Sequence, residues 1–263
     1  MSSSSNSFVS GTSSSKLRKT ASKEEEIDVI TRTPGAQKLN AKCGNMSCAA
    51  RRGDIPLKHC ARCKTIMYCS RECQVAHWKD HKTWCNNNVD HLAELEAADR
   101  DGLNVGLPDG MSLVELDQRL EKWVKYHNSL LMAATIHALE LPRDLKRSHQ
   151  YLLRVRVSYR TDNEGVPGKL FRVDKAFLVD IQSSRSKGPV WVQSIDEIER
   201  LRTESEEKRL GTVAAIALEC SPLAMQIVPF GSLRDLSPLR IQKEWKEILI
   251  RNVENGKRFT RFE

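Results

Sequence analysis

The sequence predicts an α+β fold, in which a small cysteine-rich segment precedes a larger domain with the element order helix, β-hairpin, helix, β-hairpin, helix. Two observations predict the larger domain: neighbouring runs in which apolar and polar residues alternate, and helix-capping signals in the segments around them. A third observation sets the smaller segment apart, because seven of the chain's eight cysteines lie between residues 43 and 85. Hairpin-paired strands separated by helices favour an α+β layer over a parallel, doubly wound sheet.

Residues 1–40 are rich in serine and then in charged residues, and they show no hydrophobic periodicity. This composition predicts a disordered tail. It contains no apolar stretch of the kind that a secretory signal needs, and the chain has no run of about 18 apolar residues that could span a membrane. We therefore expect the chain to stay inside the cell, in the nucleus or the cytoplasm, without a membrane partner.

Residues 41–86 are expected to form a separate small domain around cysteine and histidine. In a reducing compartment such clusters bind metal more often than they form disulfides. The spacings C-x4-C, C-x2-C, C-x3-C and H-x3-C let two ligands bind one ion from a single turn. The candidate ligands, in chain order, are Cys43, Cys48, Cys60, Cys63, Cys69, Cys73, His81 and Cys85. Eight ligands are enough for two four-coordinate Zn²⁺ ions.

The size of this segment supports the same interpretation. From Cys43 to Cys85 it has 43 residues and few large aliphatic side chains, and segments of about 40 residues seldom build a sufficient core by themselves. A structural zinc ion contributes about 10–16 kcal/mol of apparent binding free energy, which is coupled to folding. His77 lies four residues from both Cys73 and His81, so spacing alone also allows it as a ligand.

Non-ligand residues accompany the ligands in a specific order, in the motifs Cys60-Ala-Arg-Cys63, Tyr68-Cys69-Ser70-Arg-Glu-Cys73-Gln74, Trp78 and His81-Lys82-x-x-Cys85. In this order the segment 43–85, and no other part of the chain, resembles the MYND zinc finger. Its opening C-x4-C pair departs from the family's commoner C-x2-C. The resemblance makes His81 the ligand, and His77 and His59 exposed neighbours. It implies two interleaved sites, the first with Cys43, Cys48, Cys69 and Cys73, and the second with Cys60, Cys63, His81 and Cys85.

Full sets of protein ligands leave no position free for water or substrate, so both ions are expected to be structural. Members of the family are similar in binding short Pro-rich or Leu-containing peptides of partner proteins, in a shallow groove near a glutamine and a tryptophan. The matching residues are Gln74, whose amide can bond a peptide backbone, and Trp78, whose indole can stack on proline rings. The alternative for Trp78 is that it packs in the finger's small core. The resemblance implies a non-enzymatic interaction adaptor, such as a transcriptional co-regulator.

Residues 87–111 are expected to hold a short helix in VDHLAELEAADR and a linker in DGLNVGLPDG. The domain 112–263 then begins with a capping box from Ser112 to Glu115. The runs 151–160 and 170–181 alternate around a Gly/Pro loop, which predicts the first hairpin. Behind the capping box, residues recur at helical spacing at Leu113, Leu116, Leu120, Trp123 and His127.

The second half of this domain repeats the pattern. A second capping box, Ser194 to Glu197, predicts a helix that ends near Gly211. The runs TVAAIALEC and AMQIVPF predict two further strands around Ser221-Pro222. Ser237-Pro238 is interpreted as the N-cap and first residue of the last helix, with Gly256 as its C-cap. The buried face of that helix is expected to hold Ile241, Trp245, Ile248, Leu249 and Val253.

Two alternatives to protein binding remain. The segment 41–85 carries nine Lys/Arg against three Asp/Glu, whereas residues 86–263 are neutral, so nucleic-acid binding by the basic finger is one. The segment lacks a base-reading helix and interleaved aromatics, so sequence-specific DNA binding is not expected. The other is an unrecognised enzyme activity, for example of methyltransferase type, in the C-terminal domain. That domain shows no Gly-rich phosphate loop or nucleophile motif; His127 and His137 are interpreted as helix-face residues, and Cys220 as a core thiol.

Overall fold

The computed structural model describes residues 42–259, apart from Met46, residues 51–54, Val105 and Ala224. The predicted Ser-rich tail, residues 1–40, lies outside the described residues. The helices and strands, in chain order, are β1 (Lys58–His59), β2 (Met67–Tyr68), α1 (Arg71–Ala76), α2 (Trp78–Arg100), η1 (Pro108–Gly110), α3 (Leu113–Tyr126), α4 (Asn128–Ala138), η2 (Leu145–His149), β3 (Tyr151–Tyr159), η3 (Pro167–Lys169), β4 (Phe171–Asp180), α5 (Ile181–Arg185), α6 (Pro189–Glu207), β5 (Thr212–Glu219), β6 (Gln226–Leu233) and α7 (Trp245–Glu254).

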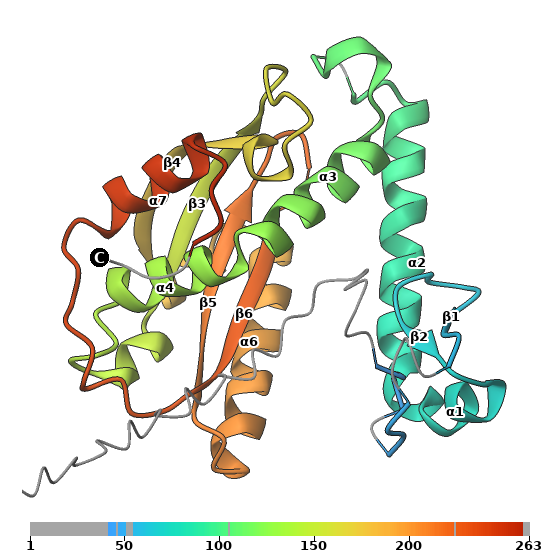
Figure 1. Ribbon diagram of the computed structural model, residues 1–263, viewed down its shortest axis with the longest axis horizontal. Helices are drawn as coiled ribbons and strands as arrows, with labels where there is room; N and C mark the ends of the chain where they lie inside the picture. Colours follow the sequence, from blue (N-terminus) through green and yellow to red (C-terminus); the bar gives the residue numbers. More distant parts are fainter. Residues whose placement is uncertain (1–41, 46, 51–54, 105, 224, 260–263) are drawn as a thin grey trace, which may run out of the picture.

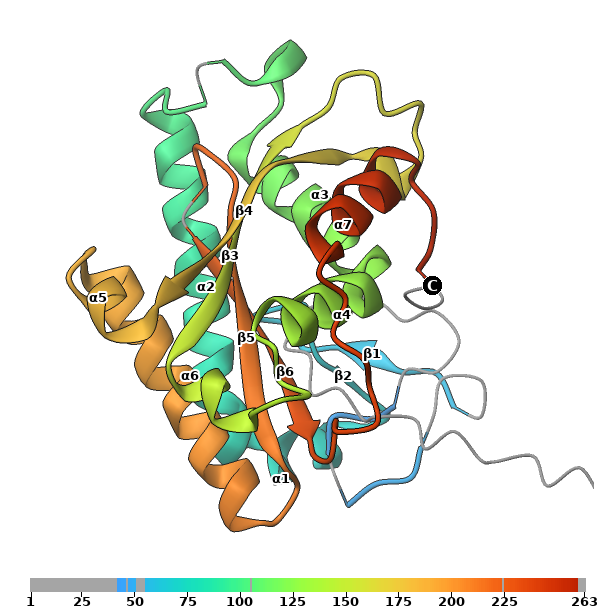
Figure 2. The same ribbon diagram turned by 90° about the vertical axis from the view of Figure 1, so that its left-hand side faces the viewer.

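A four-stranded sheet in the order β4-β3-β5-β6 forms the centre of the larger domain. Helices α3, α4 and α7 lie on one face of this sheet and α5 and α6 on the other (Figures 1 and 2). The strands pair antiparallel within β3–β4 and β5–β6, which confirms both predicted hairpins. The two hairpins join through a parallel pairing of β3 with β5, from Leu153 opposite Ile216 to Arg156 opposite Glu219. The fold is therefore α+β, as predicted, with a finger before a mixed helix and sheet domain.

Burial along the strands follows from helices covering both sheet faces. Leu153, Val155 and Val157 on β3 join a large core under α3, α4 and α7. Leu152 points to the other face and packs in a smaller core with Trp191 of α6. Every residue of β5 before Glu219 is buried, as expected for a central strand that is covered on both sides.

The helix start predicted at Ser112 is confirmed, since its hydroxyl accepts a hydrogen bond from the Glu115 backbone N–H at 3.0 Å, while the Glu115 carboxylate pairs with Arg119. The helix behind it is divided at His127, where α3 ends and α4 begins. His127 is fully buried, and its Nε2 lies 2.9 Å from the carbonyl oxygen of Gly168. This contact ties the helix junction to the loop between β3 and β4.

Two predicted helix starts are wrong. The second capping box does not open α6, because that helix begins at Pro189, and Ser194 lies in its second turn. Proline at the first helical position is itself a start signal, and here it takes precedence over the Ser/Glu pair. The last helix begins at Trp245, well after Ser237, whose hydroxyl bonds Asp235 in a turn instead.

The end of the last helix agrees with the sequence. Gly256 adopts a left-handed φ of +59° directly after the C-cap residue Asn255. Leu249 and Val253 are buried as predicted, whereas Ile241 precedes the helix and is half-buried.

Helix α2 joins the finger to the larger domain. The helix predicted in VDHLAELEAADR begins eleven residues earlier than that run, at Trp78. Its last turns contact α3: Asp99 Oδ1 accepts from the Leu113 N–H at 2.7 Å, and His91 lies 3.6 Å from Asp117. No helix among the described residues is both long and apolar enough to cross a membrane.

Candidate metal centre

The short hairpin of β1 and β2 forms the frame of the finger. Lys58 pairs with Tyr68 and His59 with Met67, so the two strands are antiparallel. A cysteine follows each strand directly: Cys60 after β1 and Cys69 after β2. The N–H of Cys60 bonds the Ile66 carbonyl at 2.8 Å and closes the turn that holds Cys63. These two cysteines belong to the two different clusters of metal ligands described below.

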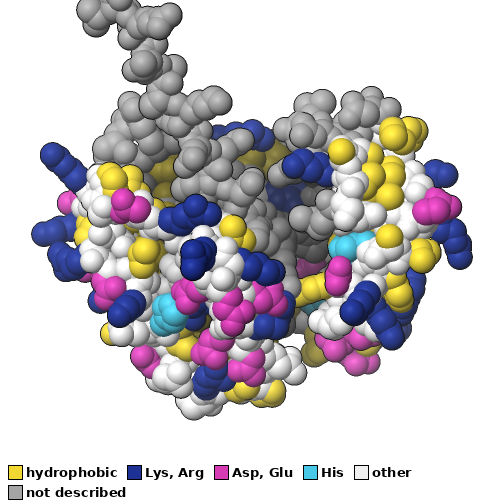
Figure 3. All heavy atoms as spheres, turned by 90° about the horizontal axis from the view of Figure 1, so that it is seen from below, with side chains coloured by type: hydrophobic (Ala, Val, Ile, Leu, Met, Phe, Trp, Pro, Cys, Tyr) yellow, Lys and Arg dark blue, Asp and Glu magenta, His cyan; other side chains and the backbone are white. Residues whose placement is uncertain are grey.

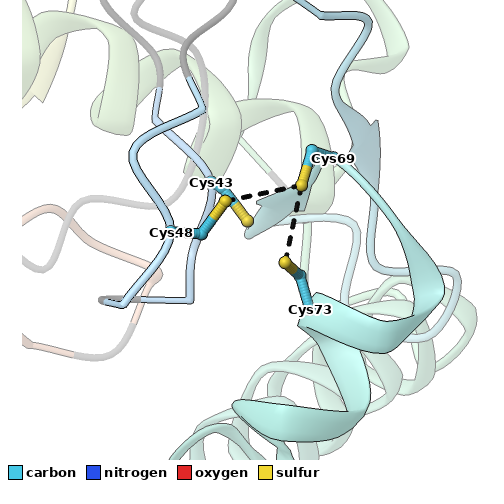
Figure 4. Close-up of side chains that lie close together, drawn as sticks. All are labelled: Cys43, Cys48, Cys69 and Cys73. Carbon is cyan, nitrogen blue, oxygen red and sulfur yellow. Dashed lines mark hydrogen bonds between the residues drawn. The ribbon is translucent and has the colours of Figure 1, made fainter.

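The first cluster contains Cys43, Cys48, Cys69 and Cys73 (Figure 4). Cys73 lies on α1, whose N-cap Ser70 accepts a hydrogen bond from the Cys73 N–H at 3.3 Å. Its sulfur lies 3.5 Å from that of Cys69, which lies 3.6 Å from that of Cys48.

The loop that carries Cys43 lies tightly against β2. The N–H of Gly44 bonds the Met67 carbonyl at 2.8 Å. A Cβ atom at position 44 would lie only 2.4 Å from Cγ2 of Ile66, so the approach requires glycine.

The second cluster contains Cys60, Cys63, His81 and Cys85. Helix α2 supplies His81 and Cys85 four residues apart, hence from one face. The sulfurs of Cys60 and Cys85 lie 3.8 Å apart, and Nε2 of His81 lies 3.5 Å from the Cys63 sulfur. His81, Cys60 and Cys85 are almost completely buried.

These distances match the edges of zinc tetrahedra. With Zn–S near 2.3 Å and Zn–N near 2.0–2.1 Å, tetrahedral geometry places two sulfurs about 3.8 Å apart and sulfur and nitrogen about 3.5 Å apart. A disulfide would need about 2.05 Å between sulfurs, and all eight cysteines are free thiols. The two groups fit two zinc ions, each with four protein ligands.

The thiols must give up protons when zinc binds. Before a cation arrives, burial raises the pKa of Cys85 to about 12. The hydrogen bond between the Cys69 and Cys73 thiols raises the pKa of Cys69 to about 12 and lowers the pKa of Cys73 to about 7. Burial, with a smaller contribution from His77, lowers the pKa of His81, which keeps the imidazole neutral and able to coordinate. Zinc binding therefore releases protons.

Side chains outside the two clusters contact the metal-ligand residues. The Gln74 amide donates to the Cys60 sulfur at 3.4 Å. The Thr65 hydroxyl lies 3.0 Å from the Cys63 sulfur and accepts from the Asn88 amide at 3.3 Å. Sequence reasoning missed the roles of Thr65 and Asn88, because nothing in their spacing indicates a ligand contact. These hydrogen bonds orient the thiolates and support their negative charge.

The remaining histidines of the finger lie outside both clusters. His77 is half-buried rather than exposed, since its Nδ1 lies 3.0 Å from the Tyr68 hydroxyl and its ring stacks on His81 at 5.9 Å. His59 is exposed on β1, as expected.

The predicted groove residues lie beside the second cluster. Trp78 is half-buried against the finger core, and its ring meets that of His81 edge-on, with 5.9 Å between centroids. Gln74 is also half-buried. Both residues thus contact the metal cluster and reach the surface.

Outside the finger, the residues considered for catalysis are buried. His127 lies in the core, and His137 accepts at Nδ1 from the Gln242 N–H at 3.3 Å. Cys220 is buried, as predicted, and burial raises its pKa to about 12, which leaves an unreactive thiol at neutral pH.

Four ligand pairs that alternate between two closed ion sites define a zinc finger with interleaved sites. The particular family follows from comparison: residues 40–85 match the family model described as MYND finger. The segment is also 43% identical over 47 residues to the MYND-type zinc finger protein MUB1 of Saccharomyces cerevisiae. Residues 40–85 are thus a MYND finger. That match covers 17% of this chain and 7% of the yeast protein, and no solved structure matches the chain.

Proposed function

We propose that this chain is a zinc-dependent interaction adaptor, whose finger binds short Pro-rich or Leu-containing segments of partner proteins through Gln74 and Trp78. The proposal includes action in the nucleus or cytoplasm and roles such as transcriptional co-regulation. The closed ligand sets support it, because a zinc ion with four protein ligands keeps no open position for catalysis. The finger then acts through its surface.

The observation that carries the proposal is the exposed face of α1 and the start of α2. Helix α1 has no buried residue, and Val75 on it is 64% exposed. Val75 follows Gln74 on α1 and lies three residues before Trp78 at the start of α2, so one short stretch of the finger carries an apolar, an amide and an indole group. Hydrophobic side chains are visible on the finger from below, with Lys and Arg side chains around them (Figure 3).

Each group has a function in peptide binding. An indole presents a flat apolar face on which a proline ring can pack. An amide can bond the backbone of an extended peptide, which lacks internal hydrogen bonds in a proline-rich conformation. Gln74 also holds the Cys60 sulfur, so the zinc cluster fixes the position of one peptide contact.

Variants of this face test the proposal. Fluorescence anisotropy of a panel of labelled Pro- and Leu-containing decapeptides is measured with the zinc-loaded full chain. Val75→Asp and Trp78→Ala should weaken binding about tenfold or more, because contact anchors commonly cost about 2 kcal/mol when truncated. Lys79→Ala, at an exposed neighbouring position, is the matched control.

Zinc content, measured by elemental analysis, separates the two roles of Trp78. Retained zinc with lost peptide binding supports a groove. Zinc loss in Trp78→Ala would assign the tryptophan to the core. Val75→Asp alone would then test the groove, since a valine side chain cannot coordinate zinc. Unchanged peptide binding in Val75→Asp would contradict the proposed groove.

The organisation proposed around this finger has four parts. Residues 1–40 are the tail, 41–86 the finger, 87–111 a helix and linker, and 112–263 an α+β domain. The large core lies mainly in the last part, joined by Leu95 and Met111, and contains no zinc ligand, which supports a unit separate from the finger.

A further inference from the structure

The face of the sheet that carries α5 and α6 is only partly covered. Its covered half contains Leu152, Val179 and Ala215, which pack against α5 and α6. Farther along the same strands the side chains become charged. There a hollow of about 480 Å³ opens, lined by Arg156, Ser158, Asp174, Glu219, Leu223 and Met225 among others.

Two exposed arginines stand on adjacent strands: Arg156 lines this hollow, and Arg172 lies beside it and bonds the lining residues Ser158 and Asp174. Arg156 on β3 is opposite Lys175 on β4, and Ser158 on β3 is opposite Arg172 on β4, so these side chains share one face. The Arg156 and Arg172 side chains are 46% and 62% exposed. Together with Lys175 they form a cationic patch across two strands.

Neighbouring groups hold both guanidinium groups by one nitrogen only. Nε of Arg156 donates to Glu219 Oε2 at 2.9 Å, and Nε of Arg172 donates to the Ser158 hydroxyl at 2.9 Å and to Asp174 at 3.2 Å. Within the described part of the chain, their terminal amino groups have no hydrogen-bond partner. A guanidinium group held at Nε presents its two terminal nitrogens as a fork, the geometry that suits a carboxylate.

Glu219 is the fixed support of this arrangement. Arg154 donates to its Oε1 from Nε at 2.9 Å, and Arg156 to its Oε2. Burial by itself would raise the pKa of Glu219, but the bonds from both arginines hold it below the ordinary value. Glu219 therefore stays ionised and orients Arg156. The three exposed cations, Arg156, Arg172 and Lys175, outnumber the two carboxylates, Asp174 and Glu219.

We propose that this patch, made of Arg156 in the hollow and Arg172 and Lys175 on the adjacent strand, binds an acidic segment of a partner protein. Charge complementarity identifies the occupant: three cationic side chains are exposed, and two of them offer forks to carboxylates. The site lies in the C-terminal domain and does not depend on the function proposed for the finger.

Two features favour a protein segment over nucleic acid. Asp174 and Glu219 lie within the face and would repel a continuous phosphate backbone, while they tolerate separate carboxylates. Leu223 and Met225 give the hollow apolar lining for the aliphatic parts of a peptide. Residues 86–263 also carry equal numbers of basic and acidic side chains, unlike a surface built for a polyanion.

The test uses the zinc-loaded full chain and fluorescein-labelled deca-glutamate, followed by anisotropy at low and high salt. The variant Arg156→Gln/Arg172→Gln should bind about tenfold more weakly, because charge-assisted, bidentate hydrogen bonds are the strong ones. The control Arg143→Gln/Arg200→Gln removes equal charge from exposed surface pairs elsewhere. It should change affinity by less than about twofold.

Three results would overturn the proposal. Equal losses in both double variants, or none in either, would place the peptide on general surface charge or on the basic finger. Tighter, patch-dependent binding of labelled deca-thymidylate would make the patch a nucleic-acid surface. Displacement of the peptide by inorganic phosphate at matched charge concentration would indicate a simple anion site. If the double variant unfolds by circular dichroism, Lys175→Gln, at an exposed position, decides by the same comparison.

Discussion

The finger and the larger domain reach a folded state by different means. The buried hydrophobic cluster of the finger consists of Cys43, Cys60, Cys85 and Tyr68, so three of its four residues are candidate metal ligands. The largest fully buried side chains of the described residues, such as Trp123, Phe171 and Phe230, all lie in the larger domain. One region thus depends on metal coordination for its stability, and the other on apolar burial. Helix α2 belongs to both regions, so whether the finger and the larger domain unfold independently is a testable question.

Chelation should give the largest difference between the two regions. A strong chelator should unfold the finger and the first turns of α2, because about 10–16 kcal/mol of metal binding per ion is lost. The larger domain should stay folded, since its core contains none of the zinc ligands. Hydrogen exchange by mass spectrometry should show lost protection up to about α2 and unchanged protection in β3 and β5.

Ligand variants give the control for this experiment. Cys73→Ser should leave one zinc ion per chain, because it breaks only the first cluster. Cys220→Ser, at the cysteine outside both clusters, should keep two. Loss of protection throughout the chain after chelation would instead show that both regions fold as one cooperative unit.

Truncation of Trp123 should destabilise the larger domain and leave the zinc finger intact, the reverse of chelation. Its ring is fully buried and contacts the Phe171 ring, with 5.9 Å between centroids. Trp123→Ala should lower the free energy of unfolding of the larger domain by about 3–5 kcal/mol, with zinc content unchanged. Leu239→Ala, at a residue 46% exposed, should cost less than about 0.5 kcal/mol. Denaturant melts measure both; zinc loss in Trp123→Ala would show coupling through α2.

Acid should weaken the larger domain through His127. Burial lowers its pKa, although the Gly168 carbonyl partly offsets this. A base with a lower pKa when folded binds protons more readily when unfolded, so stability present above its ordinary pKa of about 6.5 is lost as pH falls. One such group contributes at most about 1.4 kcal/mol per pH unit. Melts between pH 7 and 5 should therefore be less pH-dependent in His127→Gln, and equal slopes would exclude His127 as the cause.

The two regions also differ in how far the sequence predicts them. Ligand spacing predicts the eight ligands of the finger, and the resemblance to the MYND finger predicts how they divide. The structure brings both four-residue groups together. The contact of Gln74 with Cys60 depends on how α1 folds over the β1 turn, which spacing does not encode. In the larger domain, alternation predicted the first hairpin, and two runs around Ser221-Pro222 predicted the second. The parallel pairing of β3 with β5 joins residues far apart in the chain, which no local pattern predicts. The Ser-x-x-Glu signal at Ser194 also failed to predict the start of α6, because Pro189, a stronger start signal, lies five residues earlier.

The smallest predicted effect tests this last point with two copies of one motif. Ser112 caps α3 through its bond to the Glu115 N–H, so Ser112→Ala should cost about 1 kcal/mol. Ser194 begins the same Ser-x-x-Glu pattern but lies inside α6, where the backbone N–H groups already have helical partners. Ser194→Ala should therefore cost nothing and should stabilise the helix slightly, because alanine has the higher helix propensity. Denaturant melts of the two variants should differ by about 1 kcal/mol, and an equal loss in both would mean that α6 begins at Ser194 in solution.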